Sequence, residues 1–197
     1  MIVVRLGIAH HYGWAVAVTA EDGIVRDRRR IELLEEGVPP APIHHQGGFH
    51  EMHRDGAPPD DAALAALVSE VRAAAIRQTS TALDAITSEV PGQVLSLSVR
   101  GWPSDFPTDI ATLRRAPYES RADSVMYCQV LAELAQSRGW AVSFYDPKTV
   151  ESVAAAALGP RADDILFGPR STLGPPWNRD HRMALAATIV AGVPDTA

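Results

Sequence analysis

Two adjacent histidines are the first candidates for chemistry in this chain. His10 and His11 stand in a short polar turn, which is flanked by two apolar runs, residues 2–9 and 14–18. This pattern predicts a β-hairpin whose strands are buried on both faces. An imidazole beside a carboxylate can accept or donate a proton near neutral pH. We therefore expect His10 and His11 to lie at the edge of a buried sheet, as candidates for general acid–base catalysis.

An arginine and a tryptophan follow a later predicted strand, residues 93–99. Arg100 comes directly after that strand, and Trp102 follows two residues later. A guanidinium group can hold a carboxylate or a phosphate through two parallel hydrogen bonds. Arg100 is therefore a candidate for binding an anionic substrate, with Trp102 beside it. The alternative is that Arg100 pairs with a loop carboxylate, such as that of Asp105, for structural reasons.

Three more polar residues stand where later elements begin. Asp146 follows a predicted strand over residues 140–145, and Asp180 and His181 open the last predicted helix. Asp146 and His181 are candidate catalytic residues, with Asp146 orienting a histidine, and Asp180 is a candidate metal ligand. The two aspartates also have structural alternatives, because an acidic side chain at a helix start can cap the helix or complement its dipole.

Two long irregular segments accompany these residues, and such segments are often functional. Residues 100–120 are rich in arginines, acids and aromatics, and we expect them to cover the site and to contribute substrate-binding side chains: Arg114, Arg115, Tyr118 and Glu119. Residues 35–59 carry His44, His45, His50 and His53. His50 and His53 could bind a metal if they were locally helical. A solvated loop with incidental histidines is the favoured interpretation.

Hydrophobic periods predict the remaining elements. Residues 24–34 form a third strand, whose arginines make either a charged edge that resists aggregation or an anion site. Apolar residues at helical spacing predict helices over residues 60–89 and 122–138, and Cys128 falls among the core positions of the second helix. The last predicted helix starts after a capping Asn178.

The order of these elements defines the fold class. Three leading strands joined by tight turns must be antiparallel, whereas strands reached through helices run parallel to the first. The sequence therefore predicts an α/β fold with a mixed five-stranded sheet, three antiparallel strands followed by two parallel crossovers, and helices on both faces. The first strand lies at the centre. We expect one domain over residues 1–192 and a frayed tail over residues 193–197.

Composition limits the classes of partner. The 197 residues carry a net charge of -6, so the chain as a whole does not attract nucleic acid, although a local basic patch could still do so. No run is long enough to span a bilayer, and we expect no membrane association. One cysteine and no leader pattern at the N-terminus favour a cytoplasmic location.

The predicted topology and two local patterns resemble the ribonuclease H-like superfamily, including its Holliday-junction resolvase branch. Residues 7–16 are similar to the first hairpin of that group, and residues 180–186, which open with Asp180, are similar to its last helix. The resemblance implies a nuclease in which carboxylates hold divalent metal ions. This chain departs from that pattern, because Ala9 or His10 stands where the first acid is expected and Arg100 stands where another is expected. Sugar kinases and actin-like proteins share the topology, but their phosphate-binding hairpin uses glycine and hydroxyl residues.

Three functional hypotheses follow. The first is a hydrolase or lyase that acts on a small anionic molecule, with His10 or His11 as the base, Asp146 orienting it and Arg100 holding the anion. The second is a divergent metal-dependent nuclease that uses Asp146 and Asp180. The third is a non-catalytic relative that binds a ligand or a protein partner. No cofactor is specified by the pattern, and a divalent metal enters only with the second hypothesis.

Overall fold

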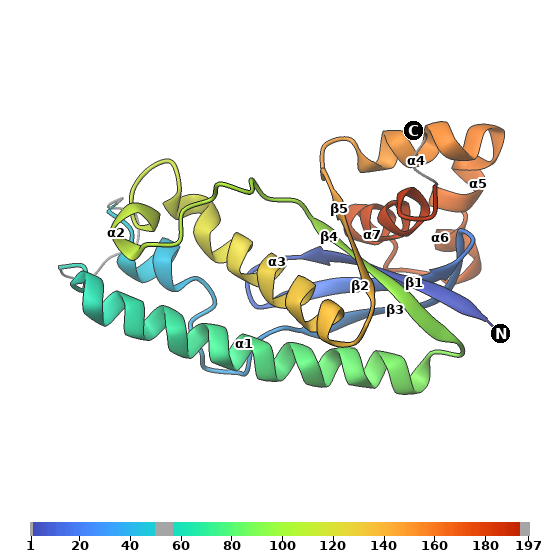
Figure 1. Ribbon diagram of the computed structural model, residues 1–197. Coiled ribbons are helices and arrows are strands. Elements are labelled where there is room, and N and C mark those ends of the chain that lie inside the picture. Colours follow the sequence, from blue (N-terminus) through green and yellow to red (C-terminus); the bar gives the residue numbers. More distant parts are fainter. Residues whose placement is uncertain (1, 50–56, 194–197) are drawn as a thin grey trace.

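A five-stranded mixed sheet forms the centre of the molecule (Figure 1). The computed structural model describes residues 2–49 and 57–193. The strands are β1 (Val3–His10), β2 (Trp14–Glu21), β3 (Ile24–Glu32), β4 (Gln93–Arg100) and β5 (Ala141–Tyr145). Their spatial order is β3-β2-β1-β4-β5. The three leading strands are antiparallel, while β4 and β5 run parallel to β1, which confirms the predicted mixed sheet with the first strand at its centre.

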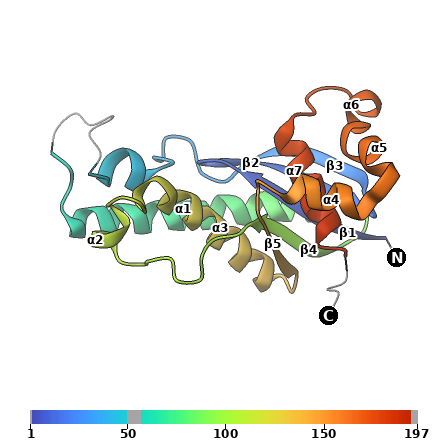
Figure 2. The ribbon, with the colours of Figure 1, turned by 90° about the horizontal axis from the view of Figure 1, so that it is seen from above.

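Helices cover both faces of this sheet (Figures 1 and 2). The helical elements are η1, a π-helix (Pro42–Gly47), α1 (Asp61–Glu89), α2 (Ile110–Leu113), α3 (Glu119–Ser137), α4 (Val150–Leu158), η2, a 3₁₀-helix (Gly159–Arg161), α5 (Ala162–Phe167), α6 (Pro169–Thr172) and α7 (Arg179–Val190). Among the helices in the described ranges, none combines the length with the apolar composition needed to cross a bilayer.

Each face of the sheet has its own hydrophobic core. Val4, Leu6 and Ile8 of β1 pack with residues of α1 and α3. Ala9 packs in a second core with residues of α4, α5 and α7. Because successive side chains of a strand point to opposite faces, this division follows from the sequence of β1. The even-numbered residues of β1 therefore face α1 and α3, and this parity places His10 on the side of α3.

The helix pair α1 and α3 continues beyond the sheet, where η1 and α2 pack against it (Figure 2). A small cluster of Ile43, Leu113 and Ala122 is buried there. The irregular segment 35–59 thus contains a turn of π-helix at its centre. The predicted histidine metal site depended on His50 and His53, and both residues lie outside the described residues. The predicted tail also lies outside them from residue 194 on.

Helix starts were predicted with mixed success. Asp60 caps α1 by accepting a hydrogen bond from the backbone N–H of Ala63, and Asn178 caps α7. The expected cap at Asp146 is wrong, because α4 begins only at Val150. The second long helix starts earlier than the predicted residue 122, since α3 already begins at Glu119.

Candidate functional site

A tight turn holds the histidine pair at the end of the sheet. His10 is the last residue of β1, and the backbone N–H of His11 donates a hydrogen bond of 2.8 Å to the carbonyl oxygen of Trp14. Gly13 completes the turn with φ of 80°, a backbone conformation that glycine adopts without steric cost. The turn therefore fixes the backbone positions of both histidines. Because side chains alternate along β1, the ring of His10 lies on the side of the sheet that faces α3.

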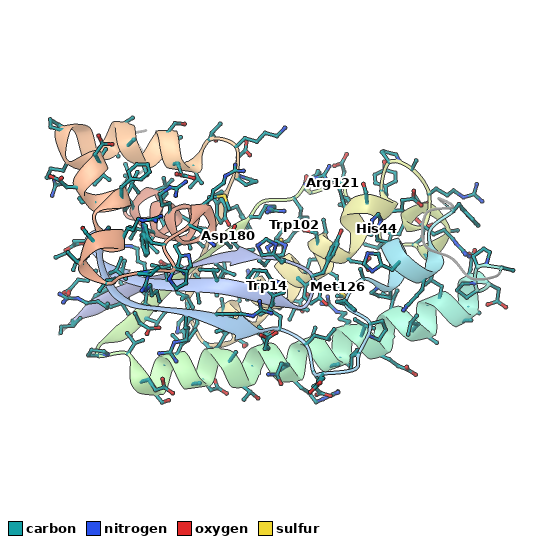
Figure 3. The ribbon with its side chains drawn as sticks, turned by 180° about the vertical axis from the view of Figure 1, so that it is seen from behind. Trp14, His44, Trp102, Arg121, Met126 and Asp180 are labelled. Carbon is teal, nitrogen blue, oxygen red and sulfur yellow. The ribbon has the colours of Figure 1, made fainter. Side chains whose placement is uncertain are left out.

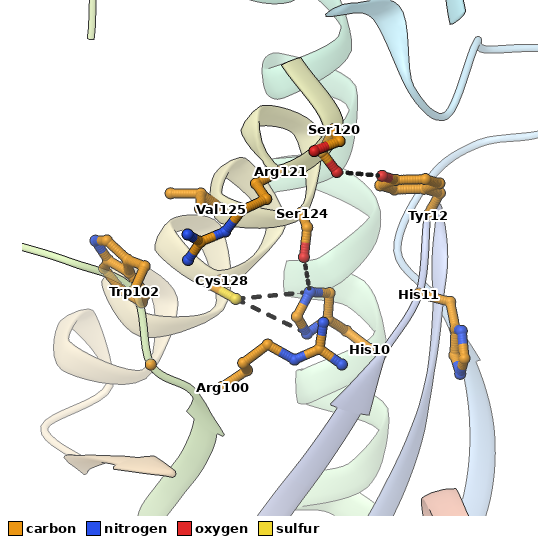
Figure 4. A pocket seen from close by; sticks show the side chains of 11 residues that line it. His10, His11, Tyr12, Arg100, Trp102, Ser120, Arg121, Ser124, Val125 and Cys128 are labelled. Atoms are coloured by element: carbon orange, nitrogen blue, oxygen red, sulfur yellow. Dashed lines mark hydrogen bonds between the residues drawn. The ribbon is translucent and has the colours of Figure 1, made fainter. Parts of the chain in front are cut away.

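A cavity of about 250 Å³ opens where the end of β1, the end of β4 and the first half of α3 meet (Figure 4). Its lining residues are His10, His11, Tyr12, Arg100, Gly101, Trp102, Ser120, Arg121, Ser124, Val125 and Cys128. Four of the residues predicted to form a site, namely two histidines, one arginine and one tryptophan, are thus brought together. No Asp or Glu is among these lining residues, whereas two arginines are.

His10 is buried at the base of the cavity, with 3% of its surface exposed. Its Nε2 atom lies 2.9 Å from Oγ of Ser124, and Sγ of Cys128 lies 3.6 Å from the same nitrogen. Burial lowers the pKa of His10 to about 3, and the nearby charges of Arg100 and His11 add to this shift. The imidazole is therefore neutral at physiological pH and can accept a proton or a hydrogen bond.

One nitrogen of the Arg100 guanidinium group lacks a hydrogen-bond partner in the described part of the chain. This atom, Nε, is buried, and no carboxylate in that part of the chain forms an ion pair with Arg100. The predicted alternative of an Arg100–Asp105 pair is therefore absent. A buried guanidinium nitrogen without a hydrogen-bond acceptor has an energetic cost.

The arginines of β3 differ sharply from Arg100. Arg26, Arg29 and Arg30 each form an ion pair with a carboxylate, and Arg28 donates to the backbone carbonyl groups of Leu173 and Pro176. These contacts match the interpretation of β3 as a charged edge strand.

A second arginine and two aromatic side chains complete the cavity wall (Figure 4). Arg121 on α3 is exposed and forms no ion pair within residues 2–49 and 57–193. Trp102 stacks edge-on against Phe144, with 5.1 Å between ring centroids. The hydroxyl of Tyr12 donates to the backbone carbonyl oxygen of Ser120 over 3.1 Å, which ties the hairpin turn to α3. The cavity therefore combines positive charge with apolar walls.

His11 points away from the buried imidazole and toward α7. Its Nε2 atom lies 3.1 Å from Oδ2 of Asp180, and its ring stacks on Trp14 with 4.1 Å between centroids. Trp14 and Asp180 are labelled in Figure 3. Asp180, predicted as a metal ligand, is thus the partner of His11 at the rim of the cavity.

Asp146 and His181 are not among the residues that line this cavity. One carboxylate oxygen of Asp146 accepts a hydrogen bond of 2.9 Å from the backbone N–H of Lys148. His181 is buried, and its Nδ1 atom lies 2.7 Å from Oδ1 of Asn178, within the cap of α7. Burial lowers the pKa of His181. The ends of β1 and β4 converge as expected, but Asp146 lies in the turn before α4 and His181 lies in the first turn of α7.

The four predicted substrate-binding residues between 114 and 119 also lie outside the cavity lining. Arg114 is buried and donates to Asp61 and to the carbonyl oxygens of Gly47 and Pro59. Arg115 donates to the carbonyl oxygen of Ala111.

The other two make structural contacts as well. Tyr118 packs edge-on against Phe106, and Glu119 accepts a hydrogen bond from the backbone N–H of Phe49. Residues 114–119 therefore connect η1, α1 and α3, and the next residue, Ser120, lines the cavity.

The chemistry of the lining does not fit a divalent metal ion. Mg²⁺ and Mn²⁺ prefer carboxylate oxygens, whereas the lining offers two guanidinium groups and no carboxylate. Across residues 2–49 and 57–193, no group of three or more His, Cys, Asp or Glu side chains is placed to hold a metal.

Sequence reasoning missed the contribution of α3. Ser120, Ser124 and Cys128 recur every fourth residue, so they share one face of that helix. This spacing was a usable signal for a polar stripe on an otherwise apolar helix.

Asp123, on another face, is buried and accepts hydrogen bonds from the backbone of η1 at Ile43 and His44. Burial raises the pKa of Asp123 to about 6.

Comparison with known proteins leaves the site as the main guide to function. No family model matches this chain, and no curated protein matches it.

Proposed function

We propose that this protein is an enzyme, a hydrolase or a lyase, that binds a small anionic substrate in the cavity between His10 and Arg100. The observation that carries this proposal is the buried, unpartnered Nε atom of Arg100 in a cavity lined by a second arginine and by no carboxylate. A carboxylate or phosphate group in the cavity would accept hydrogen bonds from the Arg100 guanidinium group and would neutralise its charge.

The proposed catalytic group is His10. Its imidazole is neutral and lies in the same cavity as Arg100, so it can take a proton from a reacting group that is held next to it. A bound anion would also offset the positive charge of Arg100, which is one cause of the low pKa of His10. That contribution to the low pKa would therefore fall when an anion is bound, while the larger contribution of burial would remain. Asp146 has no part in this mechanism.

We also propose a distant relationship to the ribonuclease H-like superfamily, which the order of the strands in the sheet supports. The nuclease alternative has weaker support. Asp180 pairs with His11, Asp146 accepts a backbone hydrogen bond of its own turn, and the cavity lacks carboxylates. A cytoplasmic location stays a prediction from cysteine content.

The binding step is tested by calorimetric titration with small anions, namely succinate, inorganic phosphate and phenyl phosphate, and with neutral succinamide as the control ligand. We expect at least one anion to bind and succinamide not to bind. Arg100→Gln should weaken anion binding about 10- to 100-fold, because one charge-assisted contact contributes about 1.5–3 kcal/mol.

Arg115→Gln is the matched control, because Arg115 is exposed and lies outside the cavity lining. Its anion affinity should equal that of the unmodified protein. Equal losses in both variants, or equal binding of succinamide, would contradict the proposed site. Anion binding without turnover of any anionic ester, amide or phosphate would favour the non-catalytic alternative.

A further inference from the structure

Ser124 and His10 form a hydrogen-bonded pair inside the cavity (Figure 4). Oγ of Ser124 lies 2.9 Å from Nε2 of His10, which is within the range of a nucleophile and its base. The two residues come from different elements, α3 and β1, so the contact depends on the tertiary fold. Both residues line the cavity, and Ser124 is half-buried.

We infer that Ser124 is the nucleophile of an ester hydrolase and that His10 is its general base. This inference rests on the proposed function and adds the reaction class and the attacking atom. The substrate class is a small ester that carries a carboxylate or phosphate group, because Arg100 and Arg121 supply positive charge on the wall of the same cavity.

The reaction has two balanced halves. Oγ of Ser124 attacks the ester carbonyl carbon while its proton passes to Nε2 of His10, and the ester C–O bond then breaks as the leaving alcohol takes that proton. Water next attacks the acyl–serine ester and gives its proton to His10, which returns it to Oγ as the acid product departs. Water is the only co-reactant, and no group is oxidised or reduced.

The other nucleophilic side chains of the cavity are less suited to this role. Cys128 is buried, and burial raises the pKa of its thiol to about 12, so it is not a thiolate at neutral pH. Ser120, one helical turn before Ser124, directs its hydroxyl to the carbonyl oxygen of Pro117, 3.5 Å away. Ser124 and Cys128 both line the cavity and contact the neutral imidazole, but Ser124 is half-buried whereas Cys128 is only 1% exposed.

The test uses para-nitrophenyl hydrogen succinate, an anionic activated ester, with the intact protein. We expect a burst of about one equivalent of nitrophenolate. Mass spectrometry of the trapped protein should show a succinyl group on Ser124. Ser124→Ala should abolish both the burst and the adduct, whereas Ser120→Ala should preserve them. His10→Gln should slow acylation about 100-fold or more.

Succinate binding, measured by calorimetry on the same samples, separates this inference from the proposed function. Succinate binding that is intact in Ser124→Ala, together with loss of the adduct, supports the nucleophile. If succinate binds but the unmodified protein carries its adduct on Cys128, on Lys148 or nowhere, the assignment of Ser124 as the nucleophile is overturned while the anion site stands. If succinate does not bind and no adduct forms, both fail. Peptide mapping of the unmodified protein identifies the residue that carries the succinyl group, even if a variant misfolds.

Discussion

At the scale of single residues, the site depends on two groups placed in unusual environments. His10 is a buried imidazole beside a cation, and Arg100 is a guanidinium without a counter-ion in the described chain. Such perturbed groups in a cavity are more frequent at functional sites than elsewhere. The ion-paired arginines of β3 show that this chain satisfies its guanidinium groups where they serve structure.

The titration of His10 is the first residue-scale prediction. Its pKa is about 3 in the folded protein and near 6.5 in the unfolded chain. Between these values the unfolded state binds more protons, so the contribution of His10 makes the free energy of unfolding rise with pH, by at most about 1.4 kcal/mol per pH unit. By NMR, the His10 ring should not titrate between pH 5 and pH 8.

Removing the neighbouring charge provides the control for this prediction. Arg100→Gln should raise the pKa of His10, because the charge of Arg100 is the second cause of the shift after burial. A His10 ring that protonates near pH 6.5 in the unmodified protein would contradict the burial and the environment described above.

At the scale of elements, strand ends were predictable and helix faces were not. The apolar runs of β1 and β4 and the connections between strands fix where His10, His11, Arg100 and Trp102 emerge. The rotation of α3 about its axis decides that Ser124 meets His10, and no sequence period encodes that docking. The cap signal at Asp146 also misplaced the start of α4, which begins at Val150.

Arg114 was predicted to bind substrate, and its contacts make a different outcome testable. Its side chain is 4% exposed and links α2 to α1 through Asp61, with further hydrogen bonds to the carbonyl oxygens of Gly47 and Pro59. Arg114→Gln should lower the free energy of unfolding in urea by about 2–3 kcal/mol and leave anion affinity unchanged. Arg115→Gln should change stability by less than about 0.5 kcal/mol. If the Arg114→Gln protein were as stable as the unmodified protein but had lost anion binding, Arg114 would be a binding residue and its structural role would be contradicted.

The packing of α7 on β1 gives a second element-scale prediction. A Cβ atom at Gly7 would lie 1.9 Å from the backbone carbonyl oxygen of Ala184, so Gly7→Ala forces the helix away from the strand. We expect a loss of about 1–3 kcal/mol in unfolding free energy, measured by urea denaturation. Gly101→Ala is the control, because the nearest atom to its Cβ would be 3.6 Å away. Equal stability of both variants would contradict the close contact between α7 and β1.

At the scale of the whole molecule, an acidic protein contains a locally cationic cavity. The net charge is -6, yet the cavity at the end of the sheet presents Arg100 and Arg121 and no carboxylate. The central position of β1 produces this arrangement, because β1 pairs with β2 on one side and with β4 on the other. The two hydrophobic cores hold α3 and α7 against opposite faces, so one histidine of the pair contacts each helix.

Anomalous diffraction from a crystal soaked in selenate tests the central claim most directly, because the scattering locates the anion without any assumption about the reaction. The anion site at Arg100 predicts a strong anomalous peak beside its guanidinium and within reach of His10, and this peak should disappear when succinate is added in excess. Peaks confined to the arginines of β3 or to other surface sites, with none in the cavity, would contradict the account.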